Sequence, residues 1–352
     1  MNIIEIGLAF TAALSVSLLM TPLARRIALK YSLVDKPNQR KRHLMTTPLL
    51  GGMAIYISFA VTILAGMLLL EGVTGMIPFG WKSFCIMVIA GAGMMSIVGL
   101  VDDILGLSPL IKLALHTVAA VLVGFVFVTQ GALLNVFLTG SSYAWLTAPL
   151  TVIWLVGITN SVNLLDHADG LSAGTSGIAA VFFTIVNLIS GNYSVAFLSA
   201  ALAGSTIGFL FYNYNPASIF MGDCGSNMLG FMLGIIAVLG VYTPEGSIRE
   251  IAIFTPVLIL ALPMIDTAFV LQYRWKNGKP LFDADRNHLA HRLMRLGLSH
   301  TQAVIVLLVV AALMGTLALL LPTLKPYQAV LLFAHAFGLV VLFSFFMNRA
   351  EK

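Results

Sequence analysis

The stretch from Thr147 to Ile189, TAPLTVIWLVGITNSVNLLDHADGLSAGTSGIAAVFFTIVNLI, places two apolar runs on either side of a short polar segment, Asn163 to Gly170. Each run is close to the length of about 20 residues with which a helix crosses the hydrocarbon core of a membrane. Only a helix satisfies its own backbone hydrogen bonds in lipid. The stretch therefore predicts two membrane helices joined by a polar turn.

The same pattern of apolar runs and short polar loops extends over the whole chain. Of its 352 residues, 59% are hydrophobic and only 9% are charged, against about 25% charged residues in a soluble domain. This composition excludes a soluble enzyme, a disordered chain, a coiled coil and a disulfide-framed module. We expect a single all-α polytopic membrane domain over 1–352. Its eleven expected spans are 3–24, 51–70, 83–101, 113–130, 147–163, 171–189, 195–211, 227–242, 251–272, 303–321 and 327–347.

The positions of the basic residues predict the orientation of these spans. The first seven residues hold no Lys or Arg, so the first apolar run lacks the basic start of a signal peptide and is expected to be an anchor. The loops after odd-numbered spans and the C-terminal tail hold 16 of the 19 Lys and Arg residues. Positive residues favour the cytoplasmic side. We expect the N-terminus outside and the C-terminus in the cytoplasm.

Most aspartates fall in the same set of loops or at their edges, so we expect one polar site at the cytoplasmic face. These residues are Asp102, Asp103, Asp166, Asp169, Asp223, Asp283 and Asp285.

The first of these loops contains a dense basic patch, Arg40-Lys-Arg-His43. Such a patch is a topology signal that also attracts anionic lipid headgroups. A more specific interpretation is that Arg42 and His43 bind the phosphate of a lipid substrate. The sequence leaves both interpretations open.

The adjacent acids Asp102 and Asp103 end the third expected span. Two neighbouring carboxylates at the lipid boundary repel each other and require a cation, a metal or a shared proton. The dipole at a helix C-terminus disfavours acidic residues. We therefore favour a functional role for this pair over a solvated helix end.

The polar segment after the fifth expected span offers oxygen donors at helical spacing. If the helix continues, Asn163, Asp166 and Asp169 share one face, and His167 points elsewhere as a structural residue. Oxygen donors of this kind suit a hard cation such as Mg²⁺. Further along, Asp223 follows Gly222 just before an apolar run, where the amides of a helix N-terminus would hold a phosphate.

The last large polar loop brings His288, His291 and Arg292 to spacings of three and four residues, so a helix would present them together. Two His residues with no third His or Cys are too few for a zinc site. Phosphate recognition by Arg and His is the favoured interpretation.

These segments, in this order, resemble the polyprenyl-phosphate N-acetylhexosamine-1-phosphate transferases, with the WecA/TagO type as the closer branch. The Phe220 to Ser226 and Asn163 to Gly170 blocks are the most specific. The matching segments are the basic loop to His43, Asp102-Asp103, Asn163 to Gly170, Asn213 to Ser226, Pro263 to Asp266, and Asp285 to Arg292.

The resemblance implies transfer of a sugar 1-phosphate, with N-acetylglucosamine 1-phosphate expected, from a UDP-sugar to undecaprenyl phosphate with release of UMP. It implies Mg²⁺, or Mn²⁺ in its place, a bacterial cytoplasmic membrane, and a homodimer. Asn163 and Asp223 are the implied metal ligands, Asp102 and Asp103 the acceptor-side acid pair, and Lys112 a phosphate contact.

On the donor side, the resemblance implies that Asp169 contacts the uracil ring. Arg286, His288 and His291 are implied contacts of the pyrophosphate or the sugar. Asp166 and His288 join the acid pair as candidate catalytic residues.

Alternatives remain. The chain departs from the family pattern at Leu110, at His167-Ala168 and at Ala290, so a different N-acetylhexosamine stays open. A phospho-N-acetylmuramoyl-pentapeptide donor is disfavoured because the His triplet of that branch is absent. An ion-coupled transporter would place its acids at mid-span, whereas here they fall at the ends of spans.

Overall fold

The computed structural model describes residues 1–35, 46–70, 80–129, 146–242, 252, 254–280, 287–325, 327–336 and 338. The candidate residues Arg42, His43 and Arg286 lie outside this part of the chain.

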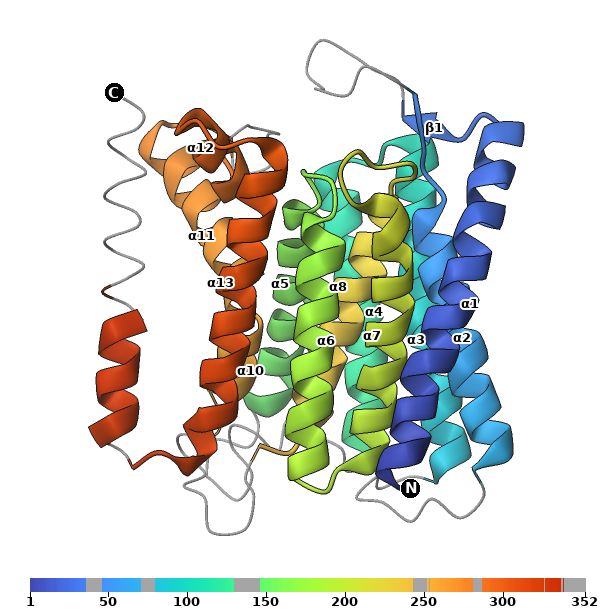
Figure 1. The fold of residues 1–352 in the computed structure, drawn as a ribbon, viewed down its shortest axis with the longest axis vertical. Helices are drawn as coiled ribbons and strands as arrows, with labels where there is room; N and C mark the ends of the chain where they lie inside the picture. The colour runs from blue at the N-terminus through green and yellow to red at the C-terminus, as the bar shows by residue number, and fades with distance from the viewer. Residues whose placement is uncertain are drawn as a thin grey trace.

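The described chain folds into a bundle of long helices (Figure 1). The helices are α1 (Ile3–Lys30), α2 (Gly51–Leu69), α3 (Trp81–Leu105), α4 (Pro109–Thr129), α5 (Thr147–Leu165), α6 (Leu171–Ile189), α7 (Tyr193–Asn213), α8 (Gly222–Leu239), α10 (Thr255–Ile259), α11 (Ala261–Lys276), α12 (Leu289–Arg295) and α13 (His300–Leu320). A 3₁₀ turn, η2 (Leu321–Thr323), follows α13. Two short strands, β1 (Val34–Asp35) and β2 (Thr47–Pro48), pair antiparallel between α1 and α2.

Eight of the described helices are long and apolar enough to cross a membrane: α1, α2, α3, α5, α6, α7, α8 and α13. The prediction of an all-α, multi-pass membrane protein is therefore confirmed. The full number of eleven stays a prediction, because the described apolar helices at Pro109–Gly124 and Tyr327–Ala336 are shorter.

The expected span over 251–272 contains a break in its helix. This segment holds two helices, α10 and α11, which meet at Leu260. Pro263 lies in the first turn of α11, and proline has no N–H to donate to the carbonyl of Ile259. A proline at this position therefore favours a break between the two helices.

Small residues bring α1 close to α7. Ala9, Ala13, Ser17 and Thr21 follow one another at intervals of four residues and are all buried. Ser17 Oγ donates a hydrogen bond of 2.7 Å to the backbone oxygen of Ser205 on α7. Small side chains at such a seam allow two membrane helices to pack closely without a gap.

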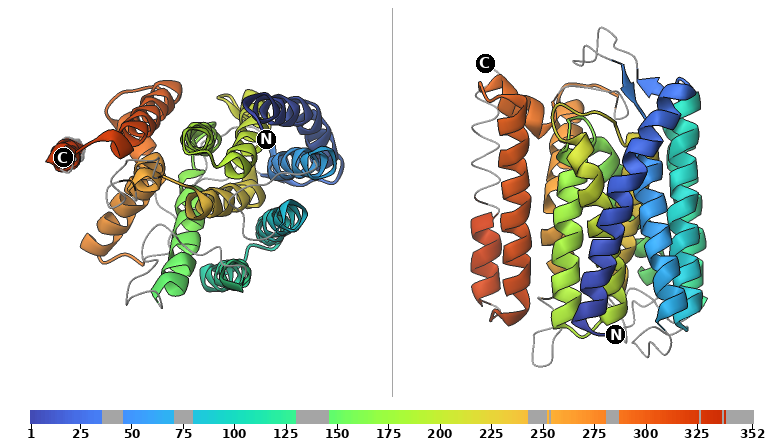
Figure 2. Two further views of the ribbon diagram at one scale, coloured as in Figure 1. Left: turned by 90° about the horizontal axis from the view of Figure 1, so that it is seen from below. Right: turned by 45° about the vertical axis from the view of Figure 1, so that its right-hand side comes forward.

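Helix α8 lies in the interior of the bundle, where it packs against α3, α5 and α2 (Figure 2). Its start is fixed by glycines on neighbouring helices: a Cβ on Gly99 of α3 would meet the Asp223 carbonyl, and a Cβ on Gly52 of α2 would meet the backbone of Gly225. The first amides of α2 also donate to this segment, from Gly51 to the Phe220 oxygen and from Gly52 to the Met221 oxygen, both at 3.0 Å. These contacts fix the backbone at the start of α8, which carries Asp223 in its first turn.

Candidate functional site

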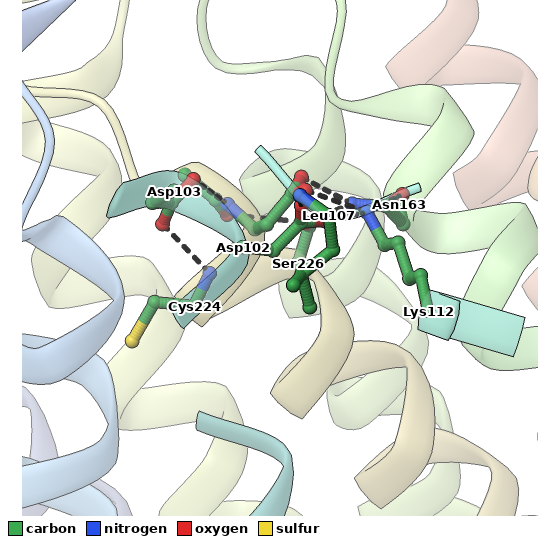
Figure 3. Close-up of polar contacts among 9 residues, drawn as sticks. Asp102, Asp103, Leu107, Lys112, Asn163, Cys224 and Ser226 are labelled. Atoms are coloured by element: carbon green, nitrogen blue, oxygen red, sulfur yellow. Dashed lines mark hydrogen bonds and ion pairs between the residues drawn. The ribbon is translucent and has the colours of Figure 1, made fainter. Parts of the chain in front are cut away.

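Four helix ends meet around the ammonium group of Lys112 (Figure 3). Lys112 belongs to the first turns of α4, and its Nζ lies 2.9 Å from Asp102 Oδ2, 2.9 Å from Asn163 Oδ1 and 2.5 Å from Asp223 Oδ2. Asp102 stands in the last turn of α3, Asn163 in the last turn of α5, and Asp223 in the first turn of α8. We call Asp102, Lys112, Asn163 and Asp223 the oxygen-lined cluster.

The end of α3 aims Asp102 at this cluster. Helix α3 ends at Gly106, which has a φ of 65° in the left-handed region. Asp102 Oδ1 accepts a hydrogen bond of 2.8 Å from the Leu107 amide just beyond this turn. The remaining oxygen, Oδ2, is the one that faces the Lys112 ammonium.

Hydrogen bonds on the amide nitrogen orient Asn163. Its Nδ2 donates to Asp223 Oδ1 at 2.7 Å and to Ser226 Oγ at 2.8 Å. The Asn163 carbonyl oxygen therefore points toward the Lys112 ammonium, alongside Asp223 Oδ2. Ser226, which the sequence motifs did not single out for any role, thus supports the geometry from one turn along α8.

Asp103 has a different task from its neighbour Asp102. Its two carboxylate oxygens accept hydrogen bonds from the backbone amides of Asp223 (2.8 Å) and Cys224 (3.0 Å) (Figure 3). The preceding Gly222 has a φ of 66°, and a Cβ there would strike the Asp103 carboxylate. The predicted phosphate nest at this helix N-terminus is therefore wrong, because a carboxylate of the chain itself occupies it.

The polar segment after α5 turns instead of continuing as a helix, so the prediction of one shared face is wrong. Helix α5 ends at Leu165, Asp166 is its C-cap with φ −80° and ψ 46°, and Gly170 has a φ of 77°. The Gly170 amide donates to Asn213 Oδ1 at 3.1 Å, and Asp169 Oδ2 accepts from the Ala217 amide at 3.1 Å. These bonds tie the turn to the loop after α7.

Asp166 lies close enough to the oxygen-lined cluster to feel its charge. Burial raises the pKa of the Asp166 carboxyl well above its ordinary value, and the nearby charges of Asp223 and Asp103 raise it further. Loss of the proton from Asp166 is therefore less favourable than from a solvent-exposed aspartate.

A second polar group, which we call the histidine cluster, consists of His167, Asp266, His288 and His291. Asp266 of α11 is fully buried. Its Oδ2 lies 2.7 Å from His288 Nδ1, and its Oδ1 accepts a hydrogen bond of 2.7 Å from the Leu289 amide at the start of α12. The His167 ring centroid is 4.1 Å from that of His288 and 4.9 Å from that of His291.

The expectation that His167 has only a local structural role missed its neighbours, because the turn after Leu165 brings its ring beside those of His288 and His291. Burial lowers the pKa of His167 well below its ordinary value, and the neighbouring His288 and His291 lower it further, so its neutral form is favoured. No spacing in the sequence could have joined His167 to Asp266, since the two are 99 positions apart.

Arg292 of α12 contacts two aromatic rings of α11. Its guanidinium carbon lies 5.9 Å from the ring centroid of Phe269 and 5.7 Å from that of Tyr273, both on α11. Its Nε donates to the Asn287 oxygen at 2.8 Å. Arg292 therefore packs α12 against α11.

Among the described candidate residues, the structure brings five into direct contact. Asp102, Asp103, Lys112, Asn163 and Asp223 form one hydrogen-bonded group. His288 and His291 belong to the histidine cluster, and Asp169 belongs to the turn between α5 and α6. Three oxygen donors around a single cation suit a hard ion and the phosphate groups that accompany it.

Comparison with known proteins gives consistent matches. Residues 85–241 match the model of glycosyl transferase family 4. A Bacillus subtilis protein described as a probable undecaprenyl-phosphate N-acetylglucosaminyl 1-phosphate transferase is 36% identical over 91% of this chain and 86% of its own length. A decaprenyl-phosphate N-acetylglucosaminephosphotransferase of Mycolicibacterium smegmatis is 31% identical over 86% of this chain and 79% of its own. An undecaprenyl-phosphate alpha-N-acetylglucosaminyl 1-phosphate transferase of Escherichia coli K12 is 27% identical over 91% of this chain and 85% of its own length.

The contacts of Asp103 predict a structural cost for its loss. In Asp103→Asn the side chain keeps one acceptor for two amides and loses its charge. A hydrogen bond to a charged group contributes about 1.5–3 kcal/mol, so the thermal unfolding midpoint of the detergent-purified protein should fall. Glu5→Gln, which alters an exposed capping carboxylate on α1, should have a smaller effect. An unchanged midpoint in Asp103→Asn would show that this carboxylate does not hold α8.

Proposed function

The chain belongs to glycosyl transferase family 4, and we propose that it transfers N-acetylglucosamine 1-phosphate from a UDP-sugar to undecaprenyl phosphate and releases UMP. The family resemblance drawn from the sequence motifs is confirmed by these matches. The relatives' names supply the chemistry of the acceptor and the sugar, and the oxygen-lined cluster is the structural observation that carries the proposal.

The architecture suits this pair of substrates. A long-chain lipid phosphate stays in the membrane with its phosphate at the surface, while a nucleotide sugar stays in water. An enzyme that joins them needs apolar helices for the first and a polar face at the membrane boundary for the second. The oxygen-lined cluster lies where α3, α5 and α8 have their polar ends.

The proposed reaction exchanges one phosphoanhydride for another. An oxygen of the acceptor phosphate attacks the phosphorus that carries the sugar, a new P–O bond forms, and the bond to the oxygen of UMP breaks. UMP leaves with the electron pair. Because the bonds broken and formed are alike, the enzyme mainly has to position two anions and reduce their repulsion.

The residues of the oxygen-lined cluster fit a divalent cation. Asn163 Oδ1, Asp223 Oδ2 and Asp102 Oδ2 already converge on one positive group, the Lys112 ammonium. Mg²⁺ prefers one or two carboxylates together with substrate phosphates and water. We propose that Asn163 and Asp223 hold Mg²⁺, or Mn²⁺ in its place; when bound, the ion supplies charge neutralisation for the donor diphosphate.

The remaining residues are assigned to the acceptor lipid phosphate or to the donor nucleotide sugar. The Asp103 carboxylate is engaged by two backbone amides. The acceptor-side role proposed for the acid pair therefore falls mainly to Asp102, which would keep the acceptor phosphate deprotonated for direct attack. We propose that Lys112 contacts a phosphate oxygen. We further propose that Asp169 contacts the uracil ring.

We also propose that the protein resides in a bacterial cytoplasmic membrane with this site facing the cytoplasm. The bias of Lys and Arg toward one set of loops supports this orientation. The basic residues Arg42 and His43 belong to that set, where they would meet the acceptor phosphate.

The proposed transfer predicts a lipid product. Purified protein with undecaprenyl phosphate, UDP-N-acetylglucosamine and Mg²⁺ should release UMP and form a lipid-linked sugar diphosphate, identified by mass spectrometry. Asp223→Ala should lose about 100-fold or more of the rate because a proposed metal ligand is removed, whereas Glu5→Gln should retain it. Wild-type activity in Asp223→Ala would refute the metal assignment. Product from UDP-N-acetylgalactosamine or UDP-N-acetylmuramoyl-pentapeptide alone would reassign the donor.

The position of Lys112 predicts a link between charge and metal binding. Lys112→Gln leaves Asp102 and Asp223 without their ammonium, so its unfolding midpoint in EDTA should fall below that of the wild type. Added Mg²⁺ should then raise the midpoint more in the variant, because no ammonium competes with the ion for the two carboxylates. A ligand at 100 times its Kd stabilises the folded protein by about 2.7 kcal/mol. Lys82→Gln, an exposed position at the start of α3, serves as the control. Equal Mg²⁺ shifts in all three proteins would contradict a cation site at this cluster.

The proposed orientation predicts where a tag is reachable. In intact cells, a tag attached at Lys352 should resist external protease and become cleavable once the membrane is opened. Cleavage in intact cells would reverse the orientation.

A further inference from the structure

Three metal-binding side chains from three separate segments meet in the histidine cluster. They are His167 in the turn after α5, Asp266 on α11, and His288 at the start of α12, and one ligand atom from each lies within 4.8 Å of the other two. We propose that these three residues form a binding site for a zinc-like divalent transition-metal ion, separate from the oxygen-lined cluster. The site goes beyond the proposed transfer reaction.

His167 carries the first argument. Both of its ring nitrogens are buried, and neither has a hydrogen-bond partner within the described part of the chain. A buried polar atom without a partner is costly, and a bound ion is one arrangement that removes this cost. Its Nε2 lies 3.9 Å from Asp266 Oδ2. A metal between these two atoms would give His167 the partner that it lacks.

Asp266 is oriented as a metal ligand should be. Its Oδ1 is fixed by the Leu289 amide, which leaves Oδ2 to face both histidines. Supporting hydrogen bonds of this kind hold ligating carboxylates in known metal sites. Because Asp266 is fully buried, its charge requires a compensating positive group, which a divalent ion supplies.

The donor set distinguishes this site from the oxygen-lined cluster. Imidazole nitrogen suits Zn²⁺, Co²⁺ and similar ions, whereas Mg²⁺ prefers oxygen alone. Two His and one carboxylate are a known ligand set for zinc with a fourth position left open. Ligand atoms around tetrahedral zinc lie about 3.3 Å apart, and the present separations of 2.7 Å and 3.9 Å fall on either side of that distance.

A bound ion would connect elements that are distant in the sequence. It would tie the turn that carries Asp169 to α11 and α12, which lie next to each other at the end of the bundle marked by β1 (Figure 1). The competing arrangement is an Asp266–His288 hydrogen bond with the His167 ring stacked on it and no metal.

The test uses the metal alone, so it does not depend on the transfer reaction. Full-length protein without a polyhistidine tag is purified in detergent, stripped with a chelator and titrated with Co²⁺. We expect the visible d–d absorption of a low-coordinate Co²⁺ site, which Zn²⁺ then abolishes. His167→Ala should weaken Co²⁺ binding at least 10-fold; it breaks no described hydrogen bond, so the fold should survive. His288→Gln should have the same effect.

Two controls separate the sites. Asp223→Ala removes a ligand of the oxygen-lined cluster and should retain the Co²⁺ spectrum, as should His335→Ala on the exposed helix near the C-terminus. The proposal is overturned if the wild type shows no Zn²⁺-displaceable absorption, if His167→Ala binds Co²⁺ like the wild type, or if Asp223→Ala abolishes the spectrum.

Discussion

A carboxylate at the edge of a membrane is stable only if a cation or a set of hydrogen-bond donors compensates its charge. This requirement organises one end of the bundle. The Lys112 ammonium compensates Asp102 and Asp223, while two backbone amides at the start of α8 compensate Asp103. The same contacts join α3, α4, α5 and α8, so the charges that serve the proposed chemistry also fix the relative positions of the helices that carry them.

Adjacent residues with the same side chain can therefore have different functions. Asp102 and Asp103 look alike in the sequence, and their resemblance to the family pair suggests one shared role. In the structure the helix turns the first toward the ammonium and the second toward the amides of α8. The first joins α3 to the ammonium of α4, while the second holds the start of α8, which carries Asp223.

The sequence predicts the helices well because lipid imposes a strict requirement on every backbone polar group. Apolar runs of sufficient length become helices wherever the structure describes them. The clustering of Asp102, Lys112, Asn163 and Asp223 also follows from the pattern, since alternate loops return to the same side. What the pattern misses depends on single backbone turns. The α5 helix ends at Leu165 where helical spacing would continue, and a break at Leu260 separates α10 from α11 inside one apolar run. The early end of α5 is also the reason that the sequence does not reveal the contact between His167 and His288.

The interior position of α8 has a consequence for biogenesis. This helix has the lowest mean hydropathy of the eight candidate spans and is among the most buried, whereas α13 has the highest and is largely exposed on the outside of the bundle. A nascent α8 that leaves the translocon alone would meet lipid with Asp223 and Asn227 unshielded. Two helices made before it supply the contacts of its polar start: α3 offers the glycine surface at Gly99, and α5 offers Asn163 as a partner for Asp223. The order of the helices along the chain therefore means that the groups that shield Asp223 are synthesised before Asp223 itself.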